Sequence, residues 1–391
     1  MIDPEALARH YTRFRVTDRI LLTGHSHQAW PDCGFEAQQE AWLDTARYVD
    51  DVWDHAFARA DQVRRGFARL LDDAPDRIAL AANTHELIVR FLSALDLRKR
   101  PRLVTTDAEF HTIRRQLDRL GEEGVEVVRV AAIPVATLAE RLARVVDDRT
   151  AAVLVSAVLY TNAQIVPNLR AAFETCQRLG AELLVDAYHA LNAVPFSLRA
   201  EHLEGAYVVG GGYKYCELGG GNAFLRMPAG CELRPVVTGW FSEFAELSEP
   251  PRPGRVGYGT GPARFAGATY DPTSHYRAAR VFRFFDEEKL TPERLRELSQ
   301  HQIAVLAKGF DALSIDARAI ERDRSVPLTG VAGFLALRTA EAARVHVALK
   351  HRDVATDYRG DVLRLGPAPY LTDRQLNASL LALGDVLRRT T

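Results

Sequence analysis

The chain has 391 residues, of which 47% are hydrophobic and 26% are charged, an ordinary composition for a globular protein with a large core. The formal net charge of −1 argues against a role that depends on electrostatic binding to nucleic acids or membrane surfaces. The four cysteines form no CxxC pair, so we expect neither a zinc ribbon nor a disulfide scaffold, and no bound metal. The first residues lack the apolar core of a signal peptide, and no apolar run has the length of a membrane span; we therefore expect a cytoplasmic protein.

Helical segments and short apolar strands alternate along the first half of the chain. Strands are expected at residues 78–82, 102–105, 125–130, 151–155 and 182–185. Helices are expected at residues 36–58, 87–95, 111–121, 135–146 and 168–179. Gly180 closes the last of these helices. This alternation predicts an α/β fold with a mainly parallel sheet that is covered by helices on both faces.

The composition changes after Trp240. A cluster of proline and glycine at residues 250–254 is incompatible with regular structure and predicts an excursion or a lobe boundary. Beyond it we expect helices at 275–285, 292–308, 341–350 and 371–387, and strands at 333–338 and 362–365. This order predicts a smaller C-terminal α/β domain. We expect an N-terminal arm, a large domain and a small domain at residues 1–25, 26–272 and 273–391.

One lysine lies between two glycine clusters. Glycines at 210–212 precede Tyr213-Lys214-Tyr215, and glycines at 219–221 follow it. The apolar runs on either side predict that a strand leaves the core here and that the chain then turns back. An amine held in a tight, partly desolvated turn tends to lose its charge, and a neutral lysine is a nucleophile toward aldehydes. The sequence therefore predicts that Lys214 binds the aldehyde of pyridoxal phosphate.

The other groups that pyridoxal phosphate requires have candidates at strand ends. Asp186 ends an apolar strand, where a carboxylate can pair with the pyridine nitrogen. Asn83 and Thr84 open a helix directly after a strand, where free amides favour a phosphate. Phe110 follows another strand and is expected to cover the ring. Each residue alone has a structural alternative, as a helix cap, a core phenylalanine or a buried hydrogen-bonded aspartate. Together with Lys214 they favour a cofactor site.

The segment DAYHALNAVPF at residues 186–196, followed by Tyr213-Lys214-Tyr215, resembles the central signature of kynureninases. Those enzymes belong to the class V branch of fold-type I pyridoxal-phosphate enzymes, and the resemblance extends from about residue 22 to the C-terminus. It implies that Lys214 carries the cofactor and that Asp186 pairs with the pyridinium. It also implies that His189 lies beside the ring and orients Asp186 or the ring oxygen. Tyr213 would reach the phosphate and relay a proton.

The same resemblance implies further cofactor contacts. Thr84 and His85 match the phosphate-binding turn, and Phe110 matches the aromatic residue that stacks on the ring. Trp240 fits the tryptophan that reaches the phosphate in kynureninases. Thr269 resembles the class V threonine that crosses from the other subunit. The resemblance therefore implies a homodimer with shared active sites.

The segment VLRLGPAPY at residues 362–370 resembles the arginine strand of the family. Arg364 would bind the substrate α-carboxylate as a two-pronged fork, which lysine cannot imitate; the alternative is a surface arginine on a strand edge. The chain departs from the family at Glu86, where a threonine is usual, and at residues 23–27 (TGHSH), which replace the usual N-terminal motif. The spacing from Asp186 to Lys214 is also slightly longer. These departures concern the substrate more than the fold or cofactor.

Several functions remain open at this point. The first hypothesis is an enzyme acting on an α-amino acid as a kynureninase-like Cβ–Cγ hydrolase or lyase. The second is a class V aminotransferase, which would use the same Lys214 and Asp186. A cysteine desulfurase needs a nucleophilic cysteine on a loop well after the lysine, and we reject it because the chain has none beyond Cys231. A cofactor-free binding protein of the same fold is disfavoured by the joint presence of lysine, aspartate and arginine. The expected partners are a small amino-acid substrate and a second copy of the chain.

Overall fold

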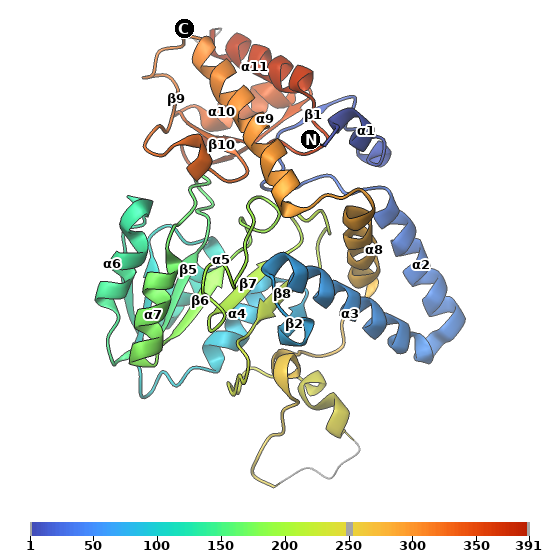
Figure 1. Ribbon diagram of the computed structural model, residues 1–391, viewed down its shortest axis with the longest axis vertical. Coiled ribbons are helices and arrows are strands. Elements are labelled where there is room, and N and C mark those ends of the chain that lie inside the picture. Colours follow the sequence, from blue (N-terminus) through green and yellow to red (C-terminus); the bar gives the residue numbers. More distant parts are fainter. Residues whose placement is uncertain (1, 248–252, 389–391) are drawn as a thin grey trace.

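The computed structural model describes residues 2–247 and 253–388, which form two α/β units, one above the other in Figure 1. The part of the predicted proline-rich excursion at residues 250–252 lies outside the described residues. Among the helices of these two ranges, none is both long and apolar enough to cross a membrane. The division of the chain at residue 272 stays a prediction.

The large unit is built on a seven-stranded sheet. Its spatial order is β2 (Ile78–Ala81), β8 (Ala223–Arg226), β7 (Tyr207–Gly211), β6 (Glu182–Asp186), β5 (Thr150–Ser156), β3 (Arg102–Thr106) and β4 (Glu126–Val130). The pairs among β7, β6, β5, β3 and β4 are parallel, whereas β8 runs antiparallel to both β2 and β7. The predicted α/β fold with a mainly parallel sheet is confirmed. Strand β8 is the segment that returns after Lys214.

Helices cover both faces of this sheet because its strands are apolar on both sides. Val153 and Val155 of β5 share a core with α3 (Val52–Leu71), α6 (Leu138–Val145) and α7 (Leu169–Leu179). Ala152 and Leu154 point to the other face and pack with α4 (Thr84–Ser93) and α5 (His111–Glu122). The side chains of one strand thus alternate between two cores, as the period of two in a strand requires.

The prediction of one continuous helix at residues 36–58 is wrong. The structure has two helices there, α2 (Cys33–Tyr48) and α3, separated by the 3₁₀ turn Val49–Asp51. Val49 has φ 53° and ψ −108°, a conformation that a β-branched residue seldom adopts. Both α2 and α3 pack against α8 (Thr273–Glu287), so the chain bends to place two helices on one partner. No glycine or proline marks this break, which tertiary packing imposes.

The small unit carries an antiparallel sheet in the order β12 (Asp357–Arg359), β13 (Val362–Leu365), β10 (Leu335–Arg338) and β9 (Glu321–Arg322). Its helices are α9 (Pro292–Ala312), α10 (Ala342–Lys350) and α11 (Asp373–Arg388). The remaining 3₁₀ turns are Thr12–Phe14, Pro75–Arg77, Val135–Thr137, Trp240–Glu246, Gly261–Phe265 and Leu328–Gly330. The strands and helices predicted for this region are present with small changes at their ends.

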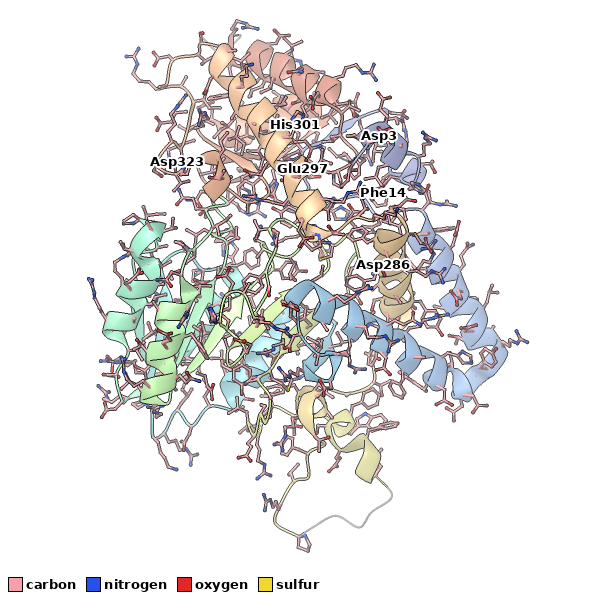
Figure 2. The ribbon with its side chains drawn as sticks, in the orientation of Figure 1. Asp3, Phe14, Asp286, Glu297, His301 and Asp323 are labelled. Atoms are coloured by element: carbon pink, nitrogen blue, oxygen red, sulfur yellow. The ribbon has the colours of Figure 1, made fainter. Side chains whose placement is uncertain are left out.

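The N-terminal arm joins the two units. After the short helix α1 (Pro4–Ala8), strand β1 (Ile20–Leu21) pairs in parallel with β11 (Val354–Ala355) of the small unit. The amide of Gly24 then donates to the carbonyl of Gly366 at 3.0 Å. Phe14, labelled in Figure 2, packs its ring 5.7 Å from that of Trp30. The arm therefore continues from the small unit into the region near Lys214.

Glu217 fixes the arm to the loop that carries Lys214. Its carboxyl group is completely buried and accepts hydrogen bonds of 2.5 Å from the Tyr11 hydroxyl and from Nε2 of Gln28. Its backbone has φ 60°, and its amide donates to the carbonyl of Lys214. Burial raises the pKa of Glu217 to about 8, against an ordinary value of 4.5. A buried carboxyl group thus connects the arm, the segment at Gln28 and the lysine loop.

This raised pKa predicts a specific pH dependence of stability. Since the folded state holds the proton more tightly than the unfolded state, the contribution of Glu217 is fully present below about pH 4.5 and is lost as the pH rises through about 8. We expect Glu217→Gln to reduce the loss of unfolding free energy between pH 4.5 and 8. Denaturant titrations of both proteins across this window measure the effect. The exposed Glu201→Gln is the control, and equal pH dependence of all three proteins would contradict the prediction.

Candidate active site

A cavity of about 390 Å³ surrounds Lys214 and receives side chains from both units and from the arm. The large unit contributes residues at the carboxyl ends of its parallel strands, where ligands of α/β sheets bind. The end of the arm contributes His25, the next residue is Ser26, and the small unit contributes Arg359 and Arg364. The structure thus brings together most of the site residues that the sequence predicted.

Lys214 is half-buried and lines this cavity. Its Nζ atom lies 2.6 Å from Nε2 of His189. The same atom lies 5.3 Å from the ring centroid of Phe110 and 4.6 Å from that of Tyr188. Burial lowers the pKa of Lys214 to about 7, although the nearby carboxylate of Asp186 opposes the shift. A substantial fraction of this amine is therefore neutral near pH 7, as a nucleophile toward an aldehyde must be.

Asp186 ends strand β6 and faces the same cavity. Its Oδ1 accepts a hydrogen bond of 2.8 Å from the amide of Tyr188. Burial raises the pKa of Asp186, and the Tyr188 amide and Lys214 partly offset this effect. In the sheet, Asp186 lies directly beside Ser156 of β5, whose hydroxyl donates to Glu109 at 2.6 Å. Asp186 thus lies at a strand end with one carboxylate oxygen bonded to the backbone.

Two predicted residues near the lysine lie in the cavity with contacts that the sequence could not specify. His189 bonds to Lys214, and its Nδ1 has no hydrogen-bond partner among the described residues. Burial lowers the pKa of His189 well below its usual value, so this imidazole is neutral. Tyr213 lines the cavity, and its ring lies edge-on to that of His27 at 5.1 Å. The hydrogen bond of His189 therefore goes to the lysine.

The start of helix α4 also lines the cavity. Asn83 is the N-cap and accepts a 3.0 Å hydrogen bond from the amide of Glu86, and both Asn83 and Thr84 line the cavity. The first amides of a helix have no acceptor within it and point toward the site of a bound anion. His85, in contrast, is exposed and does not line this cavity. Of the predicted phosphate contacts, Thr84 therefore lines the cavity and His85 does not.

Trp240 and Thr269 lie outside the Lys214 cavity of their own chain. Trp240 is 43% exposed, and Thr269 lines a second cavity of about 910 Å³. The two cavities share the wall residues Ala82, Gly220 and Gly221. Within one protomer, these two predicted cofactor contacts are therefore not made.

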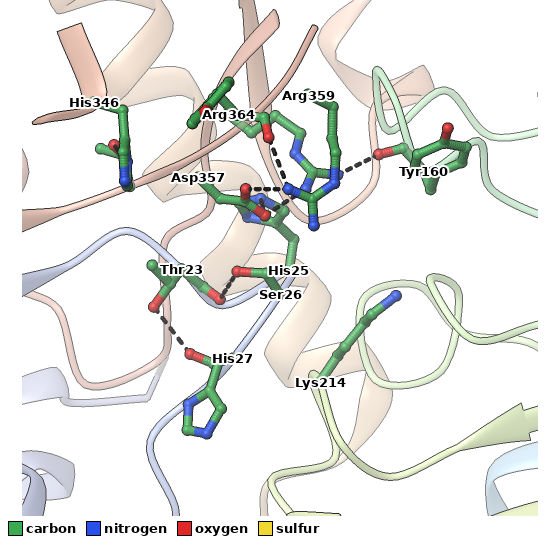
Figure 3. A network of polar contacts seen from close by, with 12 residues as sticks. Thr23, His25, Ser26, His27, Tyr160, Lys214, His346, Asp357, Arg359 and Arg364 are labelled. Carbon is green, nitrogen blue, oxygen red and sulfur yellow. Dashed lines mark hydrogen bonds and ion pairs between the residues drawn. The ribbon is translucent and has the colours of Figure 1, made fainter. Parts of the chain in front are cut away.

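Arg364 points into the cavity from β13 and is held by two groups (Figure 3). Its Nη1 donates to the carbonyl oxygen of Tyr160 at 2.7 Å, and its Nη2 forms a short ion pair with Asp357. The side chain is only 3% exposed, yet its Nε has no partner in the described part of the chain. A buried guanidinium donor without an acceptor is costly, so this position favours an anionic ligand.

Sequence reasoning missed several lining residues, and four of them have polar side chains close to the predicted ones. Ser156 ends strand β5 beside Asp186, and the strand-end rule that found Asp186 could have found it too. Tyr188, His25 and Arg359 also line the cavity. The loop after Asp186 places Tyr188, the docking of the arm places His25, and the β12–β13 register places Arg359. No local sequence pattern fixes any of these three.

The groups around the cavity fit pyridoxal phosphate. The lysine amine lies near two aromatic rings, a buried carboxylate faces it from a strand end, and a capped helix start lies in the same cavity. These groups match the imine-forming amine, the partner of the pyridine nitrogen and the phosphate site that this cofactor needs.

Comparisons with known proteins agree with this geometry, although no model of a known protein family matches the chain. An uncharacterized aminotransferase, YcbU of Bacillus subtilis (strain 168), is 22% identical over 346 residues, 87% of each protein. A kynureninase of Bacillus mycoides (strain KBAB4) is 27% identical over 299 residues, 73% of this chain and 67% of that enzyme.

Among solved structures, a K223A mutant of C-DES with glycine covalently linked to its pyridoxal-phosphate cofactor superimposes with a TM-score of 0.84. It is 16% identical to this chain and covers 96% of it, with 98% of its own length matched. The fold, the two relatives and the cavity lead to one assignment. The chain has the fold-type I fold of pyridoxal-phosphate-dependent enzymes, it is similar in sequence to a kynureninase and to an aminotransferase, and its cofactor is pyridoxal 5′-phosphate.

Proposed function

We propose that this chain acts on an α-amino acid as a kynureninase-like hydrolase or lyase that breaks the Cβ–Cγ bond. The observation that carries the proposal is Arg364, a buried guanidinium with a free Nε that lines the cavity of Lys214. An amino acid can place its carboxylate on this arginine and its amine near the lysine. Similarity to kynureninases over 73% of the chain supports the choice of reaction.

The chain's own residues supply binding and proton transfer. When bound, pyridoxal phosphate supplies an electron sink for the carbon that carries the substrate amine. Lys214 has a pKa of about 7, so its amine can both accept and donate a proton near neutral pH. Nε2 of neutral His189 lies 2.6 Å from that amine. The two groups share a hydrogen bond, in which Lys214 is either the donor or the acceptor. Asp186 would pair with the pyridine nitrogen, and Asn83 and Thr84 would hold the phosphate.

A class V aminotransferase is the second candidate. Similarity to YcbU spans 87% of both chains and favours it specifically. Both candidate reactions need Lys214, Asp186 and Arg364 in the same places. They differ in what happens after the proton leaves the α-carbon, which these three residues do not decide.

Incubation of the cofactor-loaded protein with L-kynurenine tests the proposal. Release of anthranilate and alanine would establish the Cβ–Cγ hydrolase. Conversion of the cofactor to pyridoxamine phosphate by an amino acid, reversed by a keto acid, would instead establish the aminotransferase. If purified and reconstituted protein shows no absorbance of a lysine-bound cofactor that borohydride bleaches, both enzyme functions fail and a binding protein of this fold remains.

We also propose that two copies of the chain share their active sites. Thr269 lines an adjoining cavity that shares Gly220 and Gly221 with the Lys214 cavity, and Trp240 contacts Phe241, which lines the same adjoining cavity. Phe244, 46% exposed, packs against Trp240 and extends an apolar surface there. A second copy on this face would bury that surface and bring its Thr269 toward the phosphate end. Sedimentation should report a dimer, and an active, stable monomer would contradict the proposal.

A further inference from the structure

The substrate side of the Lys214 cavity contains a second arginine, Arg359, which no part of the proposed reaction uses. Asp357 and Arg364 are directly opposite each other in the β12–β13 pair, and Arg359 lies two residues along from Asp357. Side chains two residues apart on a strand share a face. All three side chains therefore project from one face of this hairpin, and both arginines line the cavity (Figure 3).

The two arginines differ in depth. The side chain of Arg364 is 3% exposed, whereas that of Arg359 is 46% exposed. Arg364 thus occupies the interior of the cavity, and Arg359 lies at its mouth. An α-carboxylate bound by Arg364, with the amine at Lys214, leaves the side chain of the substrate to run toward solvent. A substrate side chain that extends toward solvent therefore passes close to the charged group of Arg359.

Arg359 has donors to spare. Both of its hydrogen bonds in the described structure leave from Nη1, to Oδ1 of Asp357 and to the carbonyl of Tyr358, each at 2.8 Å. A guanidinium group carries five N–H donors, so Nη2 and Nε remain for a ligand. Asp357 is shared, since its other oxygen pairs with Arg364. One carboxylate therefore faces two guanidinium groups.

His25, which lies beside Asp357, is a neutral polar side chain. His25 is 1% exposed, and neither of its ring nitrogens has a hydrogen-bond partner among the described residues. Its Nε2 lies 3.6 Å from Oδ2 of Asp357. Burial lowers the pKa of His25 to about 4, so it adds no positive charge near pH 7 but can hydrogen-bond to a ligand. Spare donors at Arg359 and an unpartnered imidazole both indicate a polar end on the substrate.

We propose that Arg359 binds a second anionic group on the substrate, so that the substrate is an α-amino acid with an acidic side chain. Arg364 takes the α-carboxylate and Arg359 takes the distal acid. This inference rests on the proposed function, because it needs an amino acid bound at Lys214. Cβ–Cγ cleavage requires a carbonyl at the γ position of the substrate. The acidic group is therefore attached to that carbonyl or lies further along the side chain.

Equilibrium binding to the cofactor-loaded protein tests this inference without turnover. The probes are the α-methyl derivatives of aspartate, glutamate and 2-aminoadipate, each paired with its neutral side-chain amide; they lack the α-proton and are followed by the change in cofactor absorbance. At least one acid should bind about 10-fold or more tightly than its amide. A bidentate arginine–carboxylate pair is strong, but the partial exposure of Arg359 weakens this one. If every acid binds no better than its amide, the inference is wrong.

Variants separate the two arginines. Arg359→Gln should weaken the acidic probe about 10-fold and leave its amide unchanged, and Arg359→Lys should restore part of the loss. Arg364→Gln should weaken both probes equally. Arg344→Gln is the matched control, because Arg344 is 41% exposed on α10 and pairs with Glu341.

The failures are distinguishable. If Arg359→Gln weakens acid and amide equally, Arg359 acts only by supporting Asp357 and the inference falls while the proposed function stands. If neither these probes nor L-kynurenine changes the absorbance of the wild-type protein, the proposed function itself falls. Thermal unfolding of each variant shows whether a loss of binding reflects the side chain or a loss of fold.

Discussion

Lys214→Ala is expected to abolish covalent attachment of the cofactor and to lower the reaction rate about 1,000-fold or more. The variant removes both the amine that binds the aldehyde and the group best placed to move the α-proton, since general acid–base catalysis alone contributes about 100- to 10,000-fold. The near-ultraviolet and visible absorbance of the purified protein, before and after borohydride, measures attachment. The same preparations give the rate with the amino acid that proves to be the substrate.

Lys308→Ala is the control for this substitution, because Lys308 is an exposed residue of helix α9. It should retain both the absorbance and the rate. Circular dichroism should find the same helix content in all three proteins, since Lys214 lies on a loop between β7 and β8. A Lys214→Ala protein that still binds the cofactor covalently would show that another lysine is the attachment site.

Asp186→Asn should lower the rate about 100-fold while leaving covalent attachment at Lys214 largely intact. The amide has the shape of the carboxyl group but no negative charge, so it cannot stabilise a proton on the pyridine nitrogen. A hydrogen bond to a charged group contributes about 1.5–3 kcal/mol, and each 1.4 kcal/mol corresponds to a factor of 10. Rate measurements at saturating cofactor, together with a cofactor titration, separate the effect on chemistry from the effect on retention.

The exposed Asp316→Asn serves as the comparison, since its carboxyl group pairs only with Arg318 near the surface. Its rate should equal that of the wild type. An unaltered rate in Asp186→Asn would remove this carboxylate from the pyridine nitrogen. Ser156→Ala should also retain the rate, because it removes a hydroxyl beside Asp186 in the sheet but leaves the charge of Asp186 in place.

The features that could be predicted from the sequence depend on local patterns. Apolar strands that alternate with helices were sufficient for the main sheet, and a carboxylate at a strand end was sufficient for Asp186. The lysine between glycine clusters and the capped start of helix α4 are also local signals. In the structure these residues meet in one cavity because the carboxyl ends of parallel strands lie on one edge of a sheet.

The features that the sequence did not reveal depend on contacts between distant segments. The break at Val49 arises because two helices pack on α8, and no residue near it is a helix breaker. Arg359 reaches the cavity only through its register with β13. His25 lies beside Asp357 because the arm pairs with the small unit, and an added Cβ at Gly366 would collide with its ring. Tertiary geometry of this kind leaves no periodic trace in the chain.

The shared wall of the two cavities has a consequence for measurements on this protein. Only Ala82 and two glycines are common to the cavity of Lys214 and the larger one beside it. If a second copy closes the larger cavity, association and cofactor binding stabilise each other by mass action. The apparent affinity for pyridoxal phosphate would then increase with the protein concentration of the assay. Dilution alone would release the cofactor, with no change in pH, temperature or sequence.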